Sequence, residues 1–137
     1  MGTVTEAQFA AMHHLADNPP AQLFGKDVII GGARGYLSIP PGVTAPMPAV
    51  LVVHEWWGLN DNIRHYADRL ASIGVAALAV DLYGGNVATT PDQASAYMKS
   101  VDPAVAIKVL KAGADYLKDE PTIKATKRGA IGFCFGG

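Results

Sequence analysis

The sequence contains a single cysteine, and this scarcity limits what the protein can be. Cys134, alone among 137 residues, cannot form a disulfide within the chain, which suits a reducing compartment and leaves the thiol free for chemistry. An excess of charge of one sign is also missing, because 11 Lys and Arg residues stand against 12 Asp and Glu residues. A net charge of −1 provides no basic field for nucleic acid or for an anionic membrane surface. We therefore expect neither partner.

Long hydrophobic runs are missing as well. The longest apolar stretches cover residues 49–53 and 75–80, whereas a membrane-spanning helix needs about 20 apolar residues. The first residues carry neither a basic region nor an apolar run, so no signal peptide is visible. No spacing of Cys and His suggests zinc. We expect a cytoplasmic protein without a metal, a cofactor or a membrane segment.

The N-terminal part of the chain predicts a helix followed by a hairpin. Apolar residues at helical spacing favour a short helix over residues 5–16. Residues 26–30 and 36–39 read as strands that the glycine-rich residues 31–35 connect. A phosphate-binding loop is the alternative, but no helix opens after the glycines and the G-x-G-x-x-G spacing is absent. We assign residues 1–24 to an N-terminal helical extension and residues 25–137 to part of a single domain.

Strands and helices alternate from residue 49 onward. Apolar runs predict buried strands at 49–53, 75–80 and 129–132. Helices are expected over about 60–73 and after the cap-and-proline pairs Thr90-Pro91 and Asp102-Pro103. This alternation predicts a three-layer α/β fold, with a mostly parallel sheet flanked by helices. Ligands bind beyond the carboxyl ends of such strands, where residues 54–58, 81–86 and 133–136 should meet.

The end of the chain carries the most specific motif. Gly132-Phe133-Cys134-Phe135-Gly136 follows a short apolar strand, which is the pattern of the nucleophile elbow of an α/β-hydrolase, with cysteine in the serine position. Glycines on both sides allow the close approach that a sharp strand-to-helix turn requires. Cys134 is therefore the candidate nucleophile. The alternative is a buried, inert cysteine that acts as a small hydrophobic residue.

A second candidate, Glu55, lies at the end of the strand over residues 49–53. A carboxylate between that strand and two tryptophans is a poor structural choice unless it has a partner. An apolar setting would favour its protonated form and make it a usable base. The alternatives are a salt bridge with Arg64 or a capping role near Asn60.

Three motifs together resemble one family, the dienelactone hydrolases (carboxymethylenebutenolidases). The resemblance covers most of the chain from about Val28, and its motifs are Val53-His54-Glu55-Trp56-Trp57-Gly58, Val80-Asp81-Leu82-Tyr83 and Gly132-Phe133-Cys134-Phe135-Gly136-Gly137. It implies an α/β-hydrolase fold and a Cys-His-Asp triad that hydrolyses enol-lactones and related esters. It also implies that Glu55 contacts the thiol of Cys134 and takes its proton when the substrate binds.

The α/β-hydrolase fold also suggests how the rest of the site is built. The backbone N–H groups of Phe135 and Trp56 are the expected oxyanion hole, because one follows the nucleophile and the other follows the central strand. The side chains of Trp57, Tyr83 and Phe133 are candidates for an apolar substrate pocket. Ordinary core or rim packing is the alternative for each of these three.

The triad acid and histidine of this fold belong after the nucleophile, beyond Gly137. Neither Asp81 nor any of the four histidines takes those positions. We therefore expect an incomplete hydrolase domain that alone is inactive, and a complementing C-terminal segment or self-association as partners. One alternative is a truncated, non-catalytic fragment that binds a partner. Within enzymes, a thioesterase or a general carboxylesterase stays open.

Overall fold

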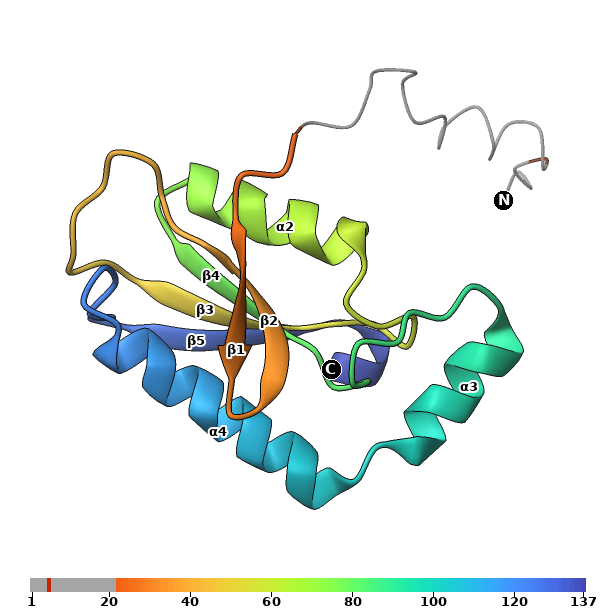
Figure 1. Ribbon diagram of the computed structural model, residues 1–137. Coiled ribbons are helices and arrows are strands. Elements are labelled where there is room, and N and C mark those ends of the chain that lie inside the picture. Colours follow the sequence, from red (N-terminus) through yellow and green to blue (C-terminus); the bar gives the residue numbers. More distant parts are fainter. Residues whose placement is uncertain (1–4, 6–21) are drawn as a thin grey trace.

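The computed structural model describes Thr5 and residues 22–137, so the helix predicted over residues 5–16 lies outside the described residues. Strands and helices alternate in the described part as the sequence predicts (Figure 1). The elements are β1 (Lys26–Ile30), β2 (Ala33–Ser38), β3 (Ala49–Val53), α2 (Asp61–Ser72), β4 (Ala76–Val80), α3 (Pro91–Ser100), α4 (Pro103–Asp119), β5 (Arg128–Gly132) and the short 3-10 helix η1 (Cys134–Gly136).

Within residues 22–137, the strands form one five-stranded sheet in the order β1-β2-β4-β3-β5. β3 lies between β4 and β5 and is parallel to both. β2 is antiparallel to β1 and to β4, so the sheet is mixed rather than parallel throughout. The antiparallel pairs arise because β1 and β2 form a hairpin, which needs no crossover helix. The α/β-hydrolase class expected from the sequence is confirmed.

The hairpin between β1 and β2 is tighter than expected. Gly31 and Gly32 alone make the turn, with φ of 57° and 85°. Positive φ at both central residues defines the two-residue turn whose twist matches that of the flanking strands. Residues 33–35 continue β2 instead of belonging to the turn, so β2 begins three residues earlier than the sequence suggested.

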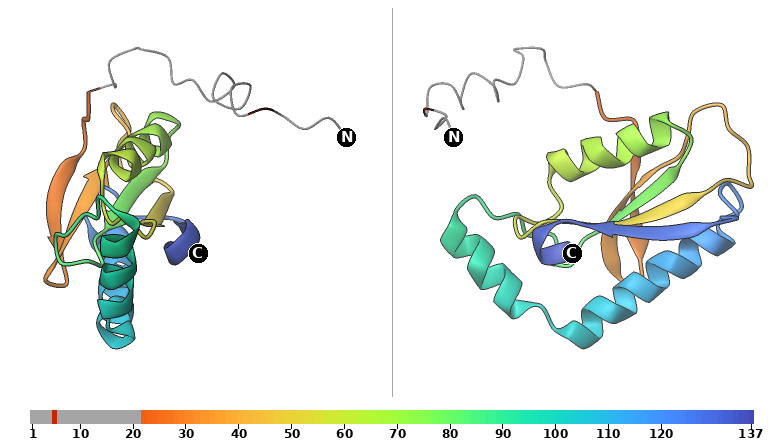
Figure 2. Two further views of the ribbon diagram at one scale, coloured as in Figure 1. Left: turned by 90° about the vertical axis from the view of Figure 1, so that its right-hand side faces the viewer. Right: turned by 180° about the vertical axis from the view of Figure 1, so that it is seen from behind.

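Helices α2 and α4 cover opposite faces of the sheet, which makes three layers (Figures 1 and 2). Each of the three α-helices begins at a polar side chain that accepts a backbone N–H: Asn60 before α2, Thr90 before α3 and Asp102 before α4. Pro91 and Pro103 occupy first-turn positions, where a missing N–H costs nothing. The helix starts predicted from these residues are confirmed.

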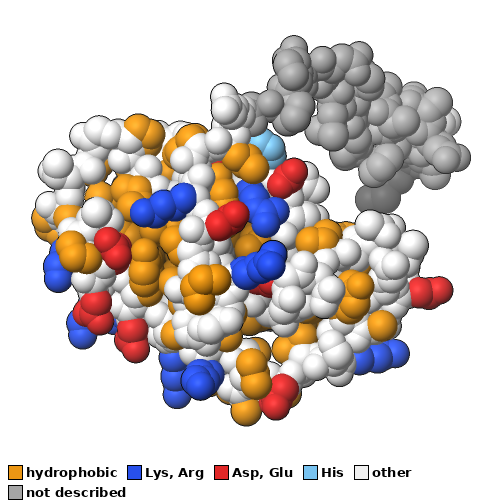
Figure 3. Space-filling view, in the orientation of Figure 1, with side chains coloured by type: hydrophobic (Ala, Val, Ile, Leu, Met, Phe, Trp, Pro, Cys, Tyr) orange, Lys and Arg blue, Asp and Glu red, His pale blue; other side chains and the backbone are white. Residues whose placement is uncertain are grey.

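The core is divided between the two faces. The α2-face cluster consists of Tyr36, Val52, Leu59, Ile63, Ala67, Ala77 and Ala79. The α4 face buries a larger set that includes Leu51, Leu78, Val80, Val109 and Leu117. Residues 128–130 of β5 are exposed, because β5 is the edge strand of the described sheet. On the face seen in Figure 3, acidic and basic side chains are interspersed, which agrees with the balanced charge of the sequence.

A buried carboxylate joins α2 to the first strands. Asp68 accepts hydrogen bonds from the hydroxyl of Tyr36 at 3.0 Å, from the hydroxyl of Ser38 at 2.7 Å and from the N–H of Phe24 at 3.0 Å. The Tyr36 hydroxyl in turn accepts the N–H of Gly25 at 2.8 Å. Burial, followed by the hydrogen bond to Asp68, raises the pKa of Tyr36 to about 12. The phenol therefore stays a donor across the physiological range.

Removing this carboxylate should destabilise the fold. Asp68→Ala leaves the hydroxyls of Tyr36 and Ser38 without their acceptor, and we expect a loss of about 2–3 kcal/mol in the free energy of unfolding. Urea denaturation measures this change in the free energy of unfolding. Asp115→Ala, at an exposed position of α4, is the control and should change the same quantity by less than about 0.5 kcal/mol. Equal effects of the two substitutions would show that the buried network contributes nothing.

Candidate active site

Three loops meet where the strands β3, β4 and β5 end. These strand-end loops consist of residues 54–58, 81–86 and 133–136. The register brings Val53 opposite both Val80 and Gly132, so β3, β4 and β5 end at the same level. The ring of His54 lies 4.7 Å from that of Tyr83 and 5.7 Å from that of Phe135, measured between centroids. One aromatic side chain from each loop therefore contributes to a single cluster.

Cys134 occupies a strained backbone position at the end of β5, among these strand-end loops. Its φ is +54°, in the left-handed region that side chains other than glycine rarely adopt, and its side chain is exposed. The N–H of Gly136 bonds to the carbonyl of Phe133 at 2.9 Å, and the N–H of Gly137 bonds to the carbonyl of Cys134 at 3.1 Å. These bonds close the tight turn of η1. The exposed thiol is at odds with the alternative of a buried, inert cysteine.

The glycines on either side of Cys134 are required by close backbone approach. A Cβ on Gly132 would overlap the carbonyl group of Gly136. A Cβ on Gly136 would lie 2.7 Å from the carbonyl oxygen of Val53 and 2.8 Å from that of His54. Both neighbours are backbone atoms that cannot move aside. The elbow therefore packs directly on the end of β3.

Glu55 lies half-buried at the end of β3, and its carboxylate has no hydrogen-bond or ion-pair partner among residues 22–137. Arg64, one alternative partner, pairs with Asp61 at 3.2 Å. Asn60 caps α2 with its own side chain, which accepts the N–H of Ile63 at 3.3 Å. The structure thus shows neither of the structural roles that the sequence allowed for Glu55.

The backbone donors expected for the oxyanion hole are free in the described part of the chain. The N–H groups of Trp56 and Phe135 donate to no described protein acceptor. Two backbone hydrogen bonds hold the loop that carries Trp56: Gly58 N–H to the carbonyl of Glu55 at 3.1 Å, and Ala88 N–H to the carbonyl of Trp57 at 2.8 Å. Both donors therefore belong to ordered turns.

The candidate pocket residues differ in how they are placed. The rings of Trp56 and Trp57 meet edge to face at 5.2 Å, and both side chains are half-buried. Tyr83 is buried, and its ring centroid lies 5.5 Å from that of Phe135. Burial, and then the charge of Cys134, raises the pKa of Tyr83. Phe133 turns toward α2 and packs edge to face on Tyr66 at 5.0 Å, which agrees with its alternative role in packing.

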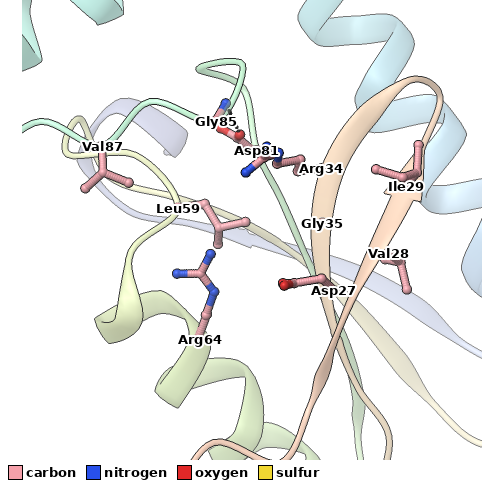
Figure 4. A pocket seen from close by; sticks show the side chains of 10 residues that line it. All are labelled: Asp27, Val28, Ile29, Arg34, Gly35, Leu59, Arg64, Asp81, Gly85 and Val87. Carbon is pink, nitrogen blue, oxygen red and sulfur yellow. Dashed lines mark hydrogen bonds between the residues drawn. The ribbon is translucent and has the colours of Figure 1, made fainter.

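A groove of about 420 Å³ lies between the β1–β2 hairpin and the start of α2, and Asp81 and Gly85 of the loop after β4 also line it (Figure 4). It combines the side chains of Arg34 and Arg64 with that of Asp27, and Leu59 provides apolar surface. Neither Cys134 nor Glu55 lines it. The candidate residues Cys134 and Glu55 therefore lie outside this groove.

Comparison with known proteins shows the family to which the chain belongs. The sequence profile described as "Dienelactone hydrolase family" matches residues 33–137, which is most of the chain. The chain belongs to this family. It is 39% identical over 110 residues to "Protein usf" of Aquifex pyrophilus, a match that covers 76% of this chain and 46% of that protein. It is 38% identical over 112 residues to the "Putative carboxymethylenebutenolidase" of Aquifex aeolicus, with the same coverage.

Solved structures of similar proteins confirm that the chain adopts the α/β-hydrolase fold. A dienelactone hydrolase-like promiscuous phosphotriesterase from metagenomic libraries superposes with a TM-score of 0.71 at 34% identity, covering 82% of this chain and 50% of that one. A structure named "m3DLH" gives a TM-score of 0.73 at the same identity and coverage. The chain thus spans about half the length of the relatives it matches.

His54 and Asp81 form the hydrogen bonds that hold the loops after β3 and β4. Asp81 accepts the N–H of Tyr83 at 2.8 Å and that of Gly85 at 2.5 Å, which shapes the loop after β4. His54 is fully buried, and its Nε2 accepts the N–H of Leu82 at 3.0 Å. The sequence placed Asp81 outside the position of the triad acid and assigned it no other role. No sequence motif assigned a role to His54, although a histidine that directly follows a buried strand is the available signal.

The imidazole of His54 is uncharged at neutral pH. Burial lowers its pKa from 6.5, although the carbonyl of Glu55 and the charge of Asp81 act in the opposite direction. Its Nε2 lies 3.9 Å from Asp81, a separation that would favour an ion pair only if the ring were protonated. Because Nε2 already accepts the N–H of Leu82, we treat this approach as a contact between a neutral ring and a carboxylate.

No helix in the described residues is long and apolar enough to cross a membrane. Across the same residues, no group of three or more His, Cys, Asp and Glu side chains is arranged to hold a metal ion.

We expect the alanine substitution of Gly136 to disrupt the elbow. Gly136→Ala should lower the free energy of unfolding by about 1–3 kcal/mol, because the new methyl group meets two backbone carbonyls. Gly129→Ala is the matched control within β5, since its Cβ would meet nothing closer than 4.0 Å. Urea unfolding of the two variants tests this. If both lose the same stability, the close approach at Gly136 is not a constraint.

Burial of neutral His54 should make the stability of the chain depend on pH. Since the pKa of His54 is lowered from 6.5 on folding, the unfolded state binds the proton more readily. The stabilisation is complete above an unfolded pKa of about 6.5 and is lost as the pH falls toward the folded pKa. The wild-type chain should therefore lose more stability between pH 8 and about pH 5 than His54→Asn does. Equal losses in urea unfolding would contradict this.

Proposed function

We propose that the chain carries the nucleophile part of a dienelactone hydrolase-like cysteine hydrolase that acts on ester or lactone bonds. The observation that supports this most strongly is the placement of Cys134 on a glycine-bounded turn with positive φ. Glu55, whose carboxylate is unpaired among the described residues, follows the neighbouring strand β3. Partial burial of a carboxylate without a hydrogen-bond or ion-pair partner is unfavourable, which favours a functional role for Glu55 over a structural one.

The proposed reaction begins with proton transfer from the Cys134 thiol to Glu55. The thiolate then attacks the carbonyl carbon, and the carbonyl electron pair moves to oxygen. The N–H groups of Trp56 and Phe135 stabilise this oxyanion. When the tetrahedral intermediate collapses, the C–O bond to the leaving alcohol breaks, the departing oxygen takes the proton that Glu55 holds, and a thioester to Cys134 remains. Water hydrolyses the thioester and regenerates the thiol.

Hydrolysis of the thioester needs a base that activates water. The family resemblance assigns this role to a histidine with an orienting acid, both after the elbow and outside these 137 residues. We therefore expect acylation of Cys134 in this chain to be followed by slow deacylation. A complementing C-terminal segment is the partner that would restore turnover. The proposed substrates are small lactones or esters, and the proposed compartment is the cytoplasm. A thioesterase or a general carboxylesterase would use the same steps on a different acyl group.

One observation favours a second candidate, a non-catalytic fragment that associates with another chain. Strand β5 is the edge of the described sheet, and residues 128–130 are exposed. Unpaired edge strands invite pairing with a second chain or with another copy. The same edge would receive a complementing segment in an active hydrolase, so only chemistry at Cys134 separates the two candidates.

Single-turnover acylation tests the proposal. With p-nitrophenyl acetate, we expect the wild-type chain to release a burst of nitrophenol and to gain an acetyl group, and Cys134→Ala to do neither. Glu55→Gln should slow the burst by about 100-fold, because it removes the proton acceptor. Glu120→Gln, at the end of α4, is the control and should leave the burst rate unchanged. A burst that persists in Cys134→Ala would show that Cys134 is not the nucleophile.

A further inference from the structure

His54 makes an unusual set of contacts for a residue with no assigned role. It is fully buried between two of the strand-end loops. Its Nδ1 lies 2.6 Å from the carbonyl oxygen of Glu55, and its Nε2 lies 3.0 Å from the backbone nitrogen of Leu82. Its ring stacks on Phe135 with an angle of 22° between the planes. One side chain thus touches the loops after β3, β4 and β5.

The hydrogen-bond partners determine which ring nitrogen carries the proton. The backbone N–H of Leu82 can only donate, so Nε2 must present its lone pair. The neutral imidazole therefore carries its proton on Nδ1, and this N–H donates a hydrogen bond to the carbonyl of Glu55. A buried neutral ring satisfies both of its nitrogens in this way.

The Glu55 carbonyl and the Trp56 N–H belong to the same peptide unit. A peptide unit is planar and trans, so its C=O and N–H point in opposite directions and cannot turn independently. A donor that holds the Glu55 oxygen therefore also sets the direction of the Trp56 N–H. Two donors hold this oxygen, His54 Nδ1 at 2.6 Å and Gly58 N–H at 3.1 Å. Of these, the contact with His54 is the shorter.

We propose that His54 is a positioning residue that orients the oxyanion hole, by holding the Glu55–Trp56 peptide so that the Trp56 N–H faces the acyl carbonyl of the substrate. This inference rests on the proposed function. Stacking on Phe135 places the same ring against the residue that provides the second N–H donor. His54 touches no reacting atom itself. Its effect should appear in steps that build negative charge on a carbonyl oxygen, and in no others.

A matched pair of variants isolates the hydrogen bond to Glu55. Asparagine and leucine branch alike at Cγ, and both lose the ring and the acceptor for Leu82. Only asparagine carries an N–H donor at the position of Nδ1. We expect His54→Asn to be acylated by p-nitrophenyl acetate within about threefold of the wild-type rate, and His54→Leu to be slowed by about tenfold or more. The N–H of Gly58 still bonds to the Glu55 oxygen in both variants.

Alkylation of Cys134 by iodoacetamide is the internal control, because attack at a saturated carbon creates no oxyanion. The alkylation rate should be the same in both variants and in the wild type. Equal acylation rates in the asparagine and leucine variants would overturn the proposal. A parallel fall of alkylation and acylation would also overturn it, because the loss would then lie in the fold or in the thiol.

Nuclear magnetic resonance keeps the inference testable if the proposed function fails. If the wild-type chain is not acylated at Cys134, the nucleophile assignment is wrong, and the chemical shift of the Trp56 backbone amide becomes the readout. The positioning role is supported if this chemical shift changes in His54→Leu and stays near its wild-type value in His54→Asn. It is overturned if the chemical shift changes in neither variant. If neither variant folds, the imidazole ¹⁵N spectrum of the wild-type chain decides. Protonation at Nδ1 supports the hydrogen bond to Glu55, and protonation at Nε2 overturns it.

Discussion

The pairing of β3 between β4 and β5 is the constraint on which the candidate site depends. Because the three strands are parallel and end at Val53, Val80 and Gly132, the residues that follow them leave the sheet at one level. A slip by one residue would turn every side chain of β3 to the opposite face and separate the loops. Specific packing opposes such a slip, because Leu51 belongs to the core on the α4 side and Val52 to the core on the α2 side. Chemistry at the strand ends therefore rests on packing in the middle of the sheet.

The loops themselves are held by polar groups that the sheet excludes from water. Asp81 accepts two backbone N–H groups of its own loop. His54 bonds to the carbonyl of Glu55 in its own loop and to the N–H of Leu82 in the loop after β4. Burying an imidazole is unfavourable unless both nitrogens find partners, and here both do. The neutral ring is thereby kept in one tautomer, whose donor faces the carbonyl of Glu55. The cost of burial is offset by hydrogen bonds that also order the residues around the nucleophile.

The candidate site also requires two backbone segments, the elbow and the end of β3, to approach each other closely. The elbow lies so near the end of β3 that Gly136 leaves no room for a methyl group. Cys134 adopts a left-handed conformation on that turn, and its side chain is exposed at the surface of the described chain. The hydrogen-bonded network of Asp68 fastens α2 to β2. The network of Asp68 therefore stabilises the fold through contacts that do not include Cys134 or Glu55.

Much of this molecule was determined by local sequence signals. Apolar runs predicted β3, β4 and β5 to within one residue, the caps Asn60, Thr90 and Asp102 predicted where the helices begin, and the glycines around Cys134 predicted the elbow. The family motifs correctly predicted the α/β-hydrolase fold. Such features depend on a few adjacent residues, so one sequence is enough to recognise them. Tertiary structure alone decided the antiparallel pairing of β2 with β4, the contact of Phe133 with Tyr66 and the hydrogen bonds of His54. Each of these joins residues that the folded sheet brings together or orients, and no spacing along the chain encodes the direction in which a buried side chain will find its partner.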